Sequence, residues 1–150
     1  MSIFPTPILL ATDGSEEARL ATQAAVELSK ATGSEVHVSY VLPTPTQLRG
    51  HHVYTDEVMQ SILERAESEA RSFLEEQAQQ ISSEGGKLAE THLLRGKADR
   101  EIVSLSEELG VGTIVMGSRG LGALRSALMG SVSASVVRHA HCPVFVVRGG

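Results

Sequence analysis

Residues 113–120 read TIVMGSRG, and after a spacer of nine residues the chain continues as GSVS at 130–133. The apolar run at 113–116 is typical of a strand, and residues 132–139 follow a helical pattern. A strand, a glycine-rich loop and a helix N-terminus in this order form an anion site. The reason is that the first N–H groups of a helix lack internal partners and the helix dipole is positive there. This stretch therefore predicts a ligand that carries phosphate.

The rest of the chain alternates strand-like runs with helical segments. We expect strands at 7–11, 35–42, 88–94, 112–116 and 143–148, and helices at 16–32, 56–83, 98–109 and 132–140. Ser15 is a candidate N-cap, and Gly33 and Gly110 are expected to end two of the helices. The repeated strand-then-helix order predicts a Rossmann-like α/β fold, a parallel sheet with helices on both faces. No linker separates two compositions, so residues 1–150 are expected to form one domain, with 43–57 as a loop whose role is open.

The composition argues against two classes of partner. The net charge is −5, whereas nucleic-acid backbones require a cationic face. The chain has no Trp, 2 Tyr and 3 Phe, too few for a platform on which bases stack. No apolar run reaches the roughly 20 residues that a membrane span needs. We therefore expect neither a nucleic-acid partner nor a membrane.

The cysteine content and the N-terminus favour the cytoplasm. The single cysteine, Cys142, excludes an internal disulfide and a multi-cysteine metal site. Residues 1–5 lack a basic region followed by an apolar stretch, so we expect no signal peptide.

Two loops are expected at strand C-termini: Thr12-Asp13-Gly14 after the first strand, and the segment from Gly117 after the fourth. Ligands of parallel sheets bind beyond the strand C-termini, where the strand order reverses. The sequence alone does not give the strand order. If the first and fourth strands are neighbours, both loops face one crevice.

Charge decides which of the two helix N-termini would take the phosphate. The first loop carries Asp13, Glu16 and Glu17, whose carboxylates already satisfy the helix dipole and would repel phosphate. The segment 117–138 has no acid, and it contains Arg119, Arg125, Arg138, Ser118, Ser126, Ser131 and Ser133. We therefore place the phosphate at 130–133 and assign Asp13 to a ribose hydroxyl or a metal ion.

Each of these features also has a purely structural interpretation. Gly130-Ser131 could be a loop followed by an ordinary Ser N-cap. Gly117 and Gly120 could permit a positive φ in a turn, and Asp13-Gly14 is a common turn pair. Neither G-x-G-x-x-G nor G-x-x-x-x-G-K-[ST] is present. The joint pattern, with glycines at strand ends and an asymmetric charge, favours a ligand site.

The pattern Gly117-x-x-Gly120-x9-Gly130-Ser131 is similar to the nucleotide-binding signature of the universal stress protein family. The likeness covers nearly the whole chain and includes ILLATDGS at 8–15 and CPVFVV at 142–147. The resemblance implies a five-stranded parallel sheet of order 3-2-1-4-5 flanked by helices, like that of the adenine nucleotide alpha hydrolases. That order makes the first and fourth strands neighbours. The signature marks the ATP-binding branch of the family, which this chain resembles.

The resemblance also implies a set of ATP-contacting positions. Carried over by position, the adenosine would lie against Ala11, Thr12, Asp13, Val41, Met116 and Gly117, and the phosphates against Arg119, Gly120, Gly130, Ser131, Val132 and Ser133. Val41 would meet the adenine through its backbone. Asp13 would lie near the ribose, and it is the one good candidate ligand for a Mg²⁺ or Mn²⁺ ion that accompanies ATP.

Other reactive side chains have structural explanations. His51-His52 are adjacent and point apart in most backbones, which disfavours metal binding. His139 and His141 lie near a helix C-terminus, where histidine suits the dipole. Cys142 opens an apolar strand and is expected to be buried and inert. Ser131 has no His or Lys near it in sequence to activate it as a nucleophile.

The apolar strand at 143–148 would lie at a sheet edge in the implied order, and a bare apolar edge invites pairing. We expect a homodimer formed by antiparallel pairing of this strand, as the family also suggests. The predicted function is a cytoplasmic ATP-binding protein that acts as a nucleotide-dependent stress-response sensor or switch with little or no turnover. The chain has no Walker lysine, and phosphoryl transfer usually needs a metal clamp. A slow ATPase or phosphotransferase, or a partner-binding dimer without nucleotide, stays open.

Overall fold

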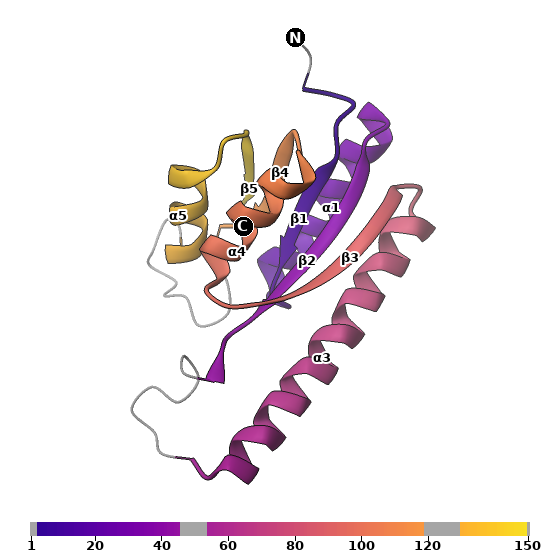
Figure 1. The fold of residues 1–150 in the computed structure, drawn as a ribbon. Helices are drawn as coiled ribbons and strands as arrows, with labels where there is room; N and C mark the ends of the chain where they lie inside the picture. The colour runs from indigo at the N-terminus through magenta and orange to yellow at the C-terminus, as the bar shows by residue number, and fades with distance from the viewer. Residues whose placement is uncertain (1–2, 46–53, 119–129, 150) are drawn as a thin grey trace.

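Strands and helices alternate along the computed structural model, which describes residues 3–45, 54–118 and 130–149 (Figure 1). The strands are β1 Ile8–Thr12, β2 Glu35–Leu42, β3 Lys87–Arg95, β4 Thr113–Gly117 and β5 Val144–Val147. The helices are α1 Glu16–Thr32, α3 Asp56–Ser83, α4 Ala98–Leu109 and α5 Ser131–His139. Every element predicted from the sequence is present, and each boundary lies within one residue of its expected position.

The strands form one parallel sheet of order β3-β2-β1-β4-β5. This confirms the predicted fold class and strand order. In the register between β1 and β4, Ala11 lies beside Met116. Because the two strands run in the same direction, the chain leaves the same end of the sheet after Thr12 and after Gly117, which meets the condition set for the two loops to face one crevice.

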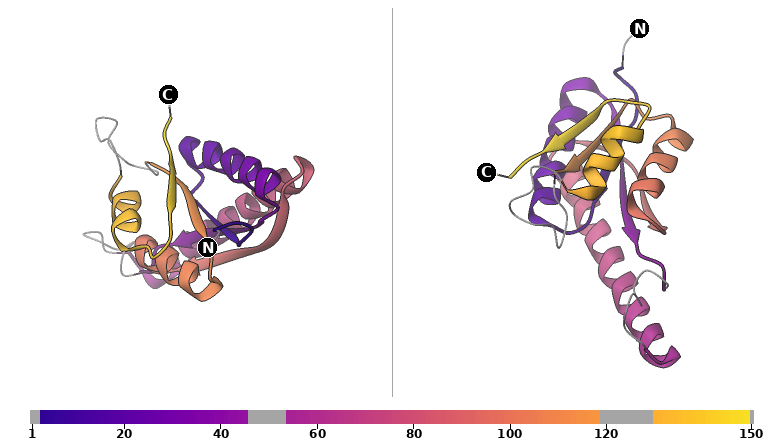
Figure 2. Two further views of the ribbon diagram at one scale, coloured as in Figure 1. Left: turned by 90° about the horizontal axis from the view of Figure 1, so that it is seen from above. Right: turned by 90° about the vertical axis from the view of Figure 1, so that its left-hand side faces the viewer.

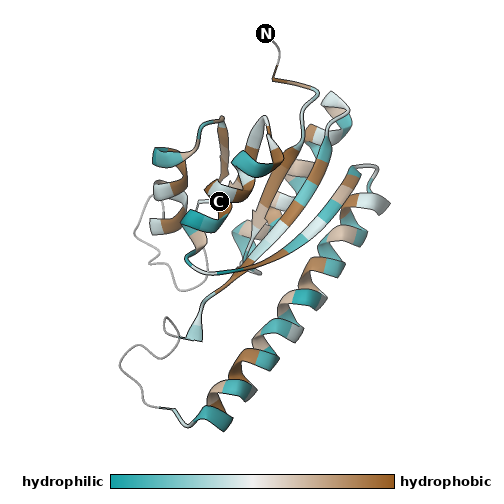
Figure 3. Cartoon of the chain, in the orientation of Figure 1, coloured by the Kyte–Doolittle hydropathy of each residue, from teal (hydrophilic) through white to brown (hydrophobic). Residues whose placement is uncertain are grey.

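Helices cover both faces of the sheet, α1 and α3 on one side and α4 and α5 on the other (Figure 2). Successive strand residues point to opposite faces, so each face has its own core. The α1–α3 core includes Ile8, Leu10, Val36, Val38, Ala21, Ala25, Leu74 and Ile81. The α4–α5 core includes Leu9, Ala11, Ile114, Met116, Ile102, Leu105 and Val136. Hydrophobic residues dominate the central strands, whereas α3 carries many polar positions (Figure 3).

The helix ends follow the sequence signals. The Ser15 hydroxyl accepts a hydrogen bond from the backbone N–H of Ala18, which caps α1 as predicted. Gly33 and Gly110 end α1 and α4 with φ of 78° and 64°, values in the left-handed region that glycine adopts without strain. Among the described helices, none is both long enough and apolar enough to cross a membrane.

Candidate functional site

The two described residues that flank the glycine loop are in direct contact. The backbone N–H of Gly130 donates a hydrogen bond of 2.6 Å to the carbonyl oxygen of Ser118. The Ser133 hydroxyl donates to the same oxygen, and the Ser118 N–H donates to the carbonyl of Val147 at 2.8 Å. Ser118 is buried. Through these hydrogen bonds it connects the end of β4 to the start of α5 and to the end of β5. Residues 118 and 130 thus meet at one point, at the carboxyl ends of β4 and β5.

The first turn of α5 has no side-chain cap among the described residues. Its N-cap is Gly130, with φ −74° and ψ 164°, and neither a side-chain cap nor an acidic residue occupies its first turn. By contrast α1 is capped by Ser15 and carries two acids in its first turn. The two helix ends therefore differ in their caps as well as in their first-turn acids, and the placement of phosphate at α5 stays a prediction. The alternative of an ordinary Ser131 N-cap is wrong, because Ser131 is already the first helical residue.

Gly117 is explained by close packing and not by a positive φ. It lies within β4, and only glycines at other described positions have positive φ. A Cβ at Gly117 would lie 3.0 Å from the backbone carbon of Glu17, so glycine is needed where β4 meets the first turn of α1. The sequence alternative of a turn glycine is therefore wrong for this residue. Gly14 does have a positive φ, of 83°, which agrees with a turn at Asp13-Gly14.

Asp13 accepts a hydrogen bond from the backbone N–H of Ser15 at 2.9 Å. Burial, followed by the charges of Asp13 and Glu69, raises the pKa of Tyr40 above its usual value. Tyr40 lies beside Thr12 in the sheet. Asp13, the residue that follows β1, therefore lies at the same end of the sheet as Tyr40 of β2.

Residues expected on the adenosine side use their side chains mainly in the core. Ala11 and Met116 belong to the α4–α5 core, and Val41 packs against it. What they present at the sheet edge is backbone. Thr12, the last residue of β1, is different: its hydroxyl oxygen is buried and has no hydrogen-bond partner among the described residues. An orphaned buried hydroxyl costs stability unless a partner arrives, so this atom fits a polar ligand group at the end of β1.

The expected phosphate contacts are partly inside the described region. Ser131 and Val132 are exposed in the first turn of α5. The Ser133 hydroxyl donates to Ser118 and Gly130 carbonyls, so Ser133 has mainly its backbone N–H to offer a ligand. Arg138 lies in the last turn of α5, at the opposite end from the expected phosphate. Arg119, Gly120 and Arg125 lie outside the described residues.

Glu17 is a buried acid in contact with Ser118 that the sequence argument did not identify. Although it is an acid in the first turn of α1, its side chain is buried. Its Oε2 accepts a hydrogen bond from the Ser118 hydroxyl at 2.5 Å, and its Oε1 accepts one from the Gly149 N–H at 3.0 Å. A signal was present in the sequence, since Glu17 precedes Ala21 and Ala25 on the apolar stripe of α1.

The described residues contain no group of three or more His, Cys, Asp or Glu side chains that could hold a metal ion. A Mg²⁺ or Mn²⁺ ion at Asp13 would therefore need most of its oxygen ligands from phosphate and water, as is usual for Mg²⁺. His51 and His52 lie outside the described residues.

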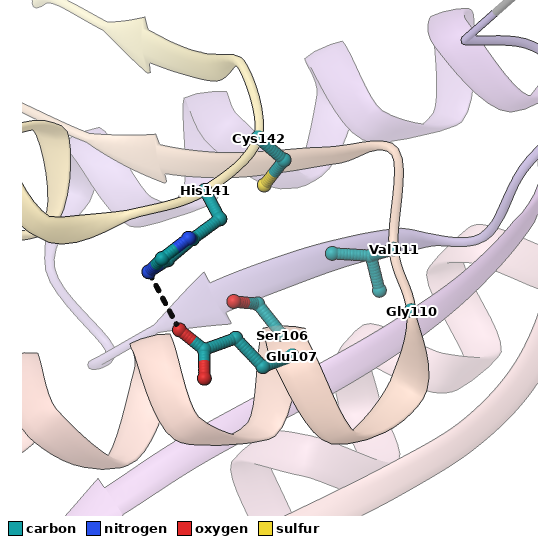
Figure 4. A pocket seen from close by; sticks show the side chains of 6 residues that line it. All are labelled: Ser106, Glu107, Gly110, Val111, His141 and Cys142. Carbon is teal, nitrogen blue, oxygen red and sulfur yellow. Dashed lines mark ion pairs between the residues drawn. The ribbon is translucent and has the colours of Figure 1, made fainter.

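A hollow of about 370 Å³ lies at the opposite edge of the sheet, between the C-terminal end of α4 and the turn before β5 (Figure 4). His141 points toward Glu107 there, with Nε2 and Oε1 3.2 Å apart. Cys142 is half-buried, not fully buried as expected, and burial raises the pKa of its thiol. A thiol held in its neutral form is a poor nucleophile, so this hollow does not have the chemistry of a cysteine active site.

The histidine at the end of α5 agrees with the sequence interpretation. His139 is the last residue of the helix, and its Nδ1 lies 2.9 Å from the carbonyl oxygen of Ser135. An imidazole near the last carbonyls of a helix is favoured by the dipole.

Comparison with known proteins gives a consistent result. The sequence profile of the universal stress protein family matches residues 6–148. Universal stress protein YxiE of Bacillus subtilis is 34% identical over 145 residues, which span 94% of this chain and 97% of that protein. The structure of universal stress protein UspA from Lactobacillus plantarum has a TM-score of 0.84 at 23% identity, covering 97% of this chain and 99% of that one. A universal stress protein from Archaeoglobus fulgidus, solved in complex with dAMP, has a TM-score of 0.68 at 27% identity, covering 97% and 99%.

Proposed function

The chain belongs to the universal stress protein family, and from that premise we propose that it binds ATP at the carboxyl ends of the neighbouring strands β1 and β4. The observation that carries the proposal is the first turn of α5, which has neither a side-chain cap nor an acid. The relative from Archaeoglobus fulgidus that was solved with dAMP supports an adenine nucleotide as the ligand class.

The phosphates are proposed to lie on the backbone N–H groups of residues 131–133. These groups belong to the first helical turn, so they lack intrahelical partners, and the dipole of α5 favours negative charge there. The Ser118–Gly130 hydrogen bond fixes where this turn begins relative to β4. Arg119 and Gly120, which the family signature assigns to the phosphates, complete the proposed set.

The nucleoside is proposed to lie over the ends of β1, β2 and β4. The Thr12 hydroxyl, which lacks a partner among the described atoms, would gain one from the ligand. Asp13, which follows β1, is proposed to accept a hydrogen bond from a ribose hydroxyl. The backbone of Val41, at the end of β2, is proposed to meet the adenine, while Ala11, Met116 and Gly117 provide the floor.

We propose a nucleotide-dependent stress-response switch with little or no turnover. Phosphoryl transfer needs a positioned base or water and usually a metal clamp. The described part of the site provides backbone N–H groups, which are proposed to bind phosphate. It also provides one carboxylate, Asp13, which could bind a Mg²⁺ or Mn²⁺ ion together with the phosphate. These groups suit binding better than activation of a nucleophile. The cytoplasmic location stays a prediction from the cysteine content.

A homodimer through β5 is part of the same proposal. β5 is an edge strand, and Phe145 on it is 48% exposed. An apolar edge strand with unpaired backbone groups favours pairing with a second copy of itself.

The first experiment is to denature the purified protein and analyse the released small molecules by mass spectrometry, followed by calorimetric titration of the stripped protein with ATP. Bound adenine nucleotide and saturable ATP binding would support the proposal. Absence of both would favour the partner-binding dimer without nucleotide. A phosphate-release assay with Mg²⁺ tests the enzyme alternative. A kcat of ~1 s⁻¹, at the low end of ordinary enzyme rates, would contradict the proposal of a switch with little or no turnover.

A further inference from the structure

The Glu17 side chain connects three parts of the fold that are distant in sequence. The residue itself belongs to the first turn of α1. One carboxylate oxygen accepts from Ser118, which follows β4, and the other accepts from Gly149, which follows β5. The two hydrogen bonds span 101 and 132 residues of sequence. Local capping of α1 does not explain this arrangement, because Ser15 already caps that helix.

The packing around Glu17 brings its carboxylate to this position. Gly117 has no side chain, so the first turn of α1 approaches β4 until a Cβ at Gly117 would touch the Glu17 backbone. A Cβ at Gly149 would likewise lie 3.0 Å from Glu17 Oε1. Gly117 therefore makes room for the backbone and Cβ of Glu17, and Gly149 makes room for its carboxylate.

Ser118 transmits the position of Glu17 to the first turn of α5. Its hydroxyl donates to Glu17, while its carbonyl oxygen accepts from the Gly130 N–H and the Ser133 hydroxyl. Loss of the Glu17 acceptor would leave the buried Ser118 hydroxyl without this partner, which favours a different orientation of Ser118. The N–H groups of residues 131–133 would then no longer be held in one direction.

We propose that Glu17 is the positioning residue of the phosphate site and couples that site to the chain after β5 through Ser118 and Gly149. The inference rests on the proposed function, because it specifies how the phosphate-binding turn is held. Coupling of this kind is reciprocal: phosphate on α5 stabilises the Glu17 hydrogen bonds, and those hydrogen bonds raise the affinity for phosphate.

The test compares ATP with adenosine, which lacks the phosphates. Calorimetric titrations use the wild-type chain, Glu17→Leu, Glu17→Gln and the control Glu16→Leu, whose wild-type carboxylate is exposed one residue earlier in the same helical turn. Glu17→Leu is expected to lower ATP affinity about tenfold or more while adenosine affinity stays within about twofold. Glu17→Gln keeps a polar partner for Ser118 and Gly149 and should recover part of the loss. Glu16→Leu should leave both affinities within about twofold.

A second variant and a spectroscopic signal separate positioning from general stability. Ser118→Ala removes the donor to Glu17 and should give the same selective loss for ATP. The double variant should lose no more than either single variant, because the two residues act in one chain of contacts. If Glu17→Leu fails to fold, the Ser118→Ala variant alone tests the positioning role. In the amide NMR spectrum, the Gly149 resonance should shift on addition of ATP to the wild type and stay unchanged in Ser118→Ala.

The outcomes distinguish the two levels of the proposal. If the wild type binds ATP but Glu17→Leu and Ser118→Ala lose ATP and adenosine affinity equally, or lose neither, the role of Glu17 is overturned and the proposed function stands. If the wild type binds neither ligand, the proposed function is overturned, and the positioning role with it.

Discussion

The N–H of Gly130 lies 2.6 Å from the carbonyl oxygen of Ser118, so the last residue of the segment before α5 is bonded to the first residue after β4. This hydrogen bond places the N-terminus of α5 at the carboxyl ends of β4 and β5, since Ser118 also bonds to Val147. It also leaves the amide groups of residues 131–133 at the helix end without competition from a cap. An anion at this edge would therefore meet a helix N-terminus whose position is fixed.

Gly130→Val is expected to reduce ATP affinity at least about tenfold and leave the fold intact. The φ of −74° at Gly130 is one that valine adopts without strain, so the added side chain should act by occupying space where phosphate approaches. Calorimetric titration gives the affinity, and circular dichroism checks the fold. Gly130→Ala is the graded control, and its ATP affinity should lie between those of the wild type and Gly130→Val. Wild-type affinity in the valine variant would refute the placement of phosphate at α5.

Thr12→Val is expected to have opposite effects on stability and on binding. The two side chains have similar shapes, and the buried Thr12 hydroxyl has no partner among the described residues, so its removal should stabilise the ligand-free protein by about 1 kcal/mol or more. If the ligand provides the missing partner, nucleotide affinity should fall. Urea unfolding measures the first effect and titration the second. A variant that is less stable would show that the hydroxyl is satisfied within the ligand-free protein.

Gln77→Met is expected to stabilise the protein by about 1–3 kcal/mol. Gln77 lies on α3 with a fully buried side chain, and both polar atoms of its amide lack hydrogen-bond partners among the described residues. Methionine has a similar length and no such groups to desolvate. The free energy of unfolding in urea should rise in this variant, whereas Gln79→Met, at an exposed position of the same helix, should change it by less than about 0.5 kcal/mol. Equal effects at both positions would contradict this explanation.

The sequence predicted the fold closely because each of its signals acts locally. Ser15 and Gly33 mark the ends of α1, and the apolar runs mark the strands, without any information from distant residues. Strand order is a long-range property. It was obtained only through the family resemblance, which correctly placed β1 beside β4.

The site was predicted less completely, for the same reason. The open first turn of α5 could be read from the absence of acids after Gly130. The contact between Glu17 and Ser118 could not, because it joins residues 101 positions apart and depends on how closely α1 packs on Gly117. The sequence analysis considered Glu17 only as one of the acids that make the N-terminus of α1 unsuitable for phosphate. The structure instead buries it at the base of the candidate site.

Stability is expected to fall as the pH drops below about 6.5, with His37 as one cause. Burial, and then the positive charge of nearby His92, lower the pKa of His37 in the folded protein from 6.5, while Glu90 and Glu35 oppose the shift. The unfolded chain therefore binds more protons in the interval between the two pKa values, so stability rises with pH there and is lost as pH falls through it. His37 Nδ1 lies 3.0 Å from His92 Nε2, and this hydrogen bond cannot survive protonation of both rings.

The measurement is urea unfolding at about pH 5.5 and about pH 7.5 for the wild type and His37→Gln. The difference in unfolding free energy between the two pH values should be smaller in the variant, because glutamine does not titrate. An equal or larger difference in the variant would exclude His37 as a source of the pH dependence.

Phe145→Lys is expected to weaken the proposed dimer about tenfold or more. β5 pairs with β4 on one side, and its other side is a sheet edge with Phe145 exposed. Antiparallel pairing of two such edges would place apolar side chains of both copies together, and a lysine there would bring two like charges close to each other and to apolar surface. Val58→Lys, at an exposed apolar position on α3, is the matched control and should leave the dimer unchanged. Light scattering after size exclusion gives the mass. A wild-type monomer at micromolar concentration, or equal weakening by both variants, would contradict pairing through β5.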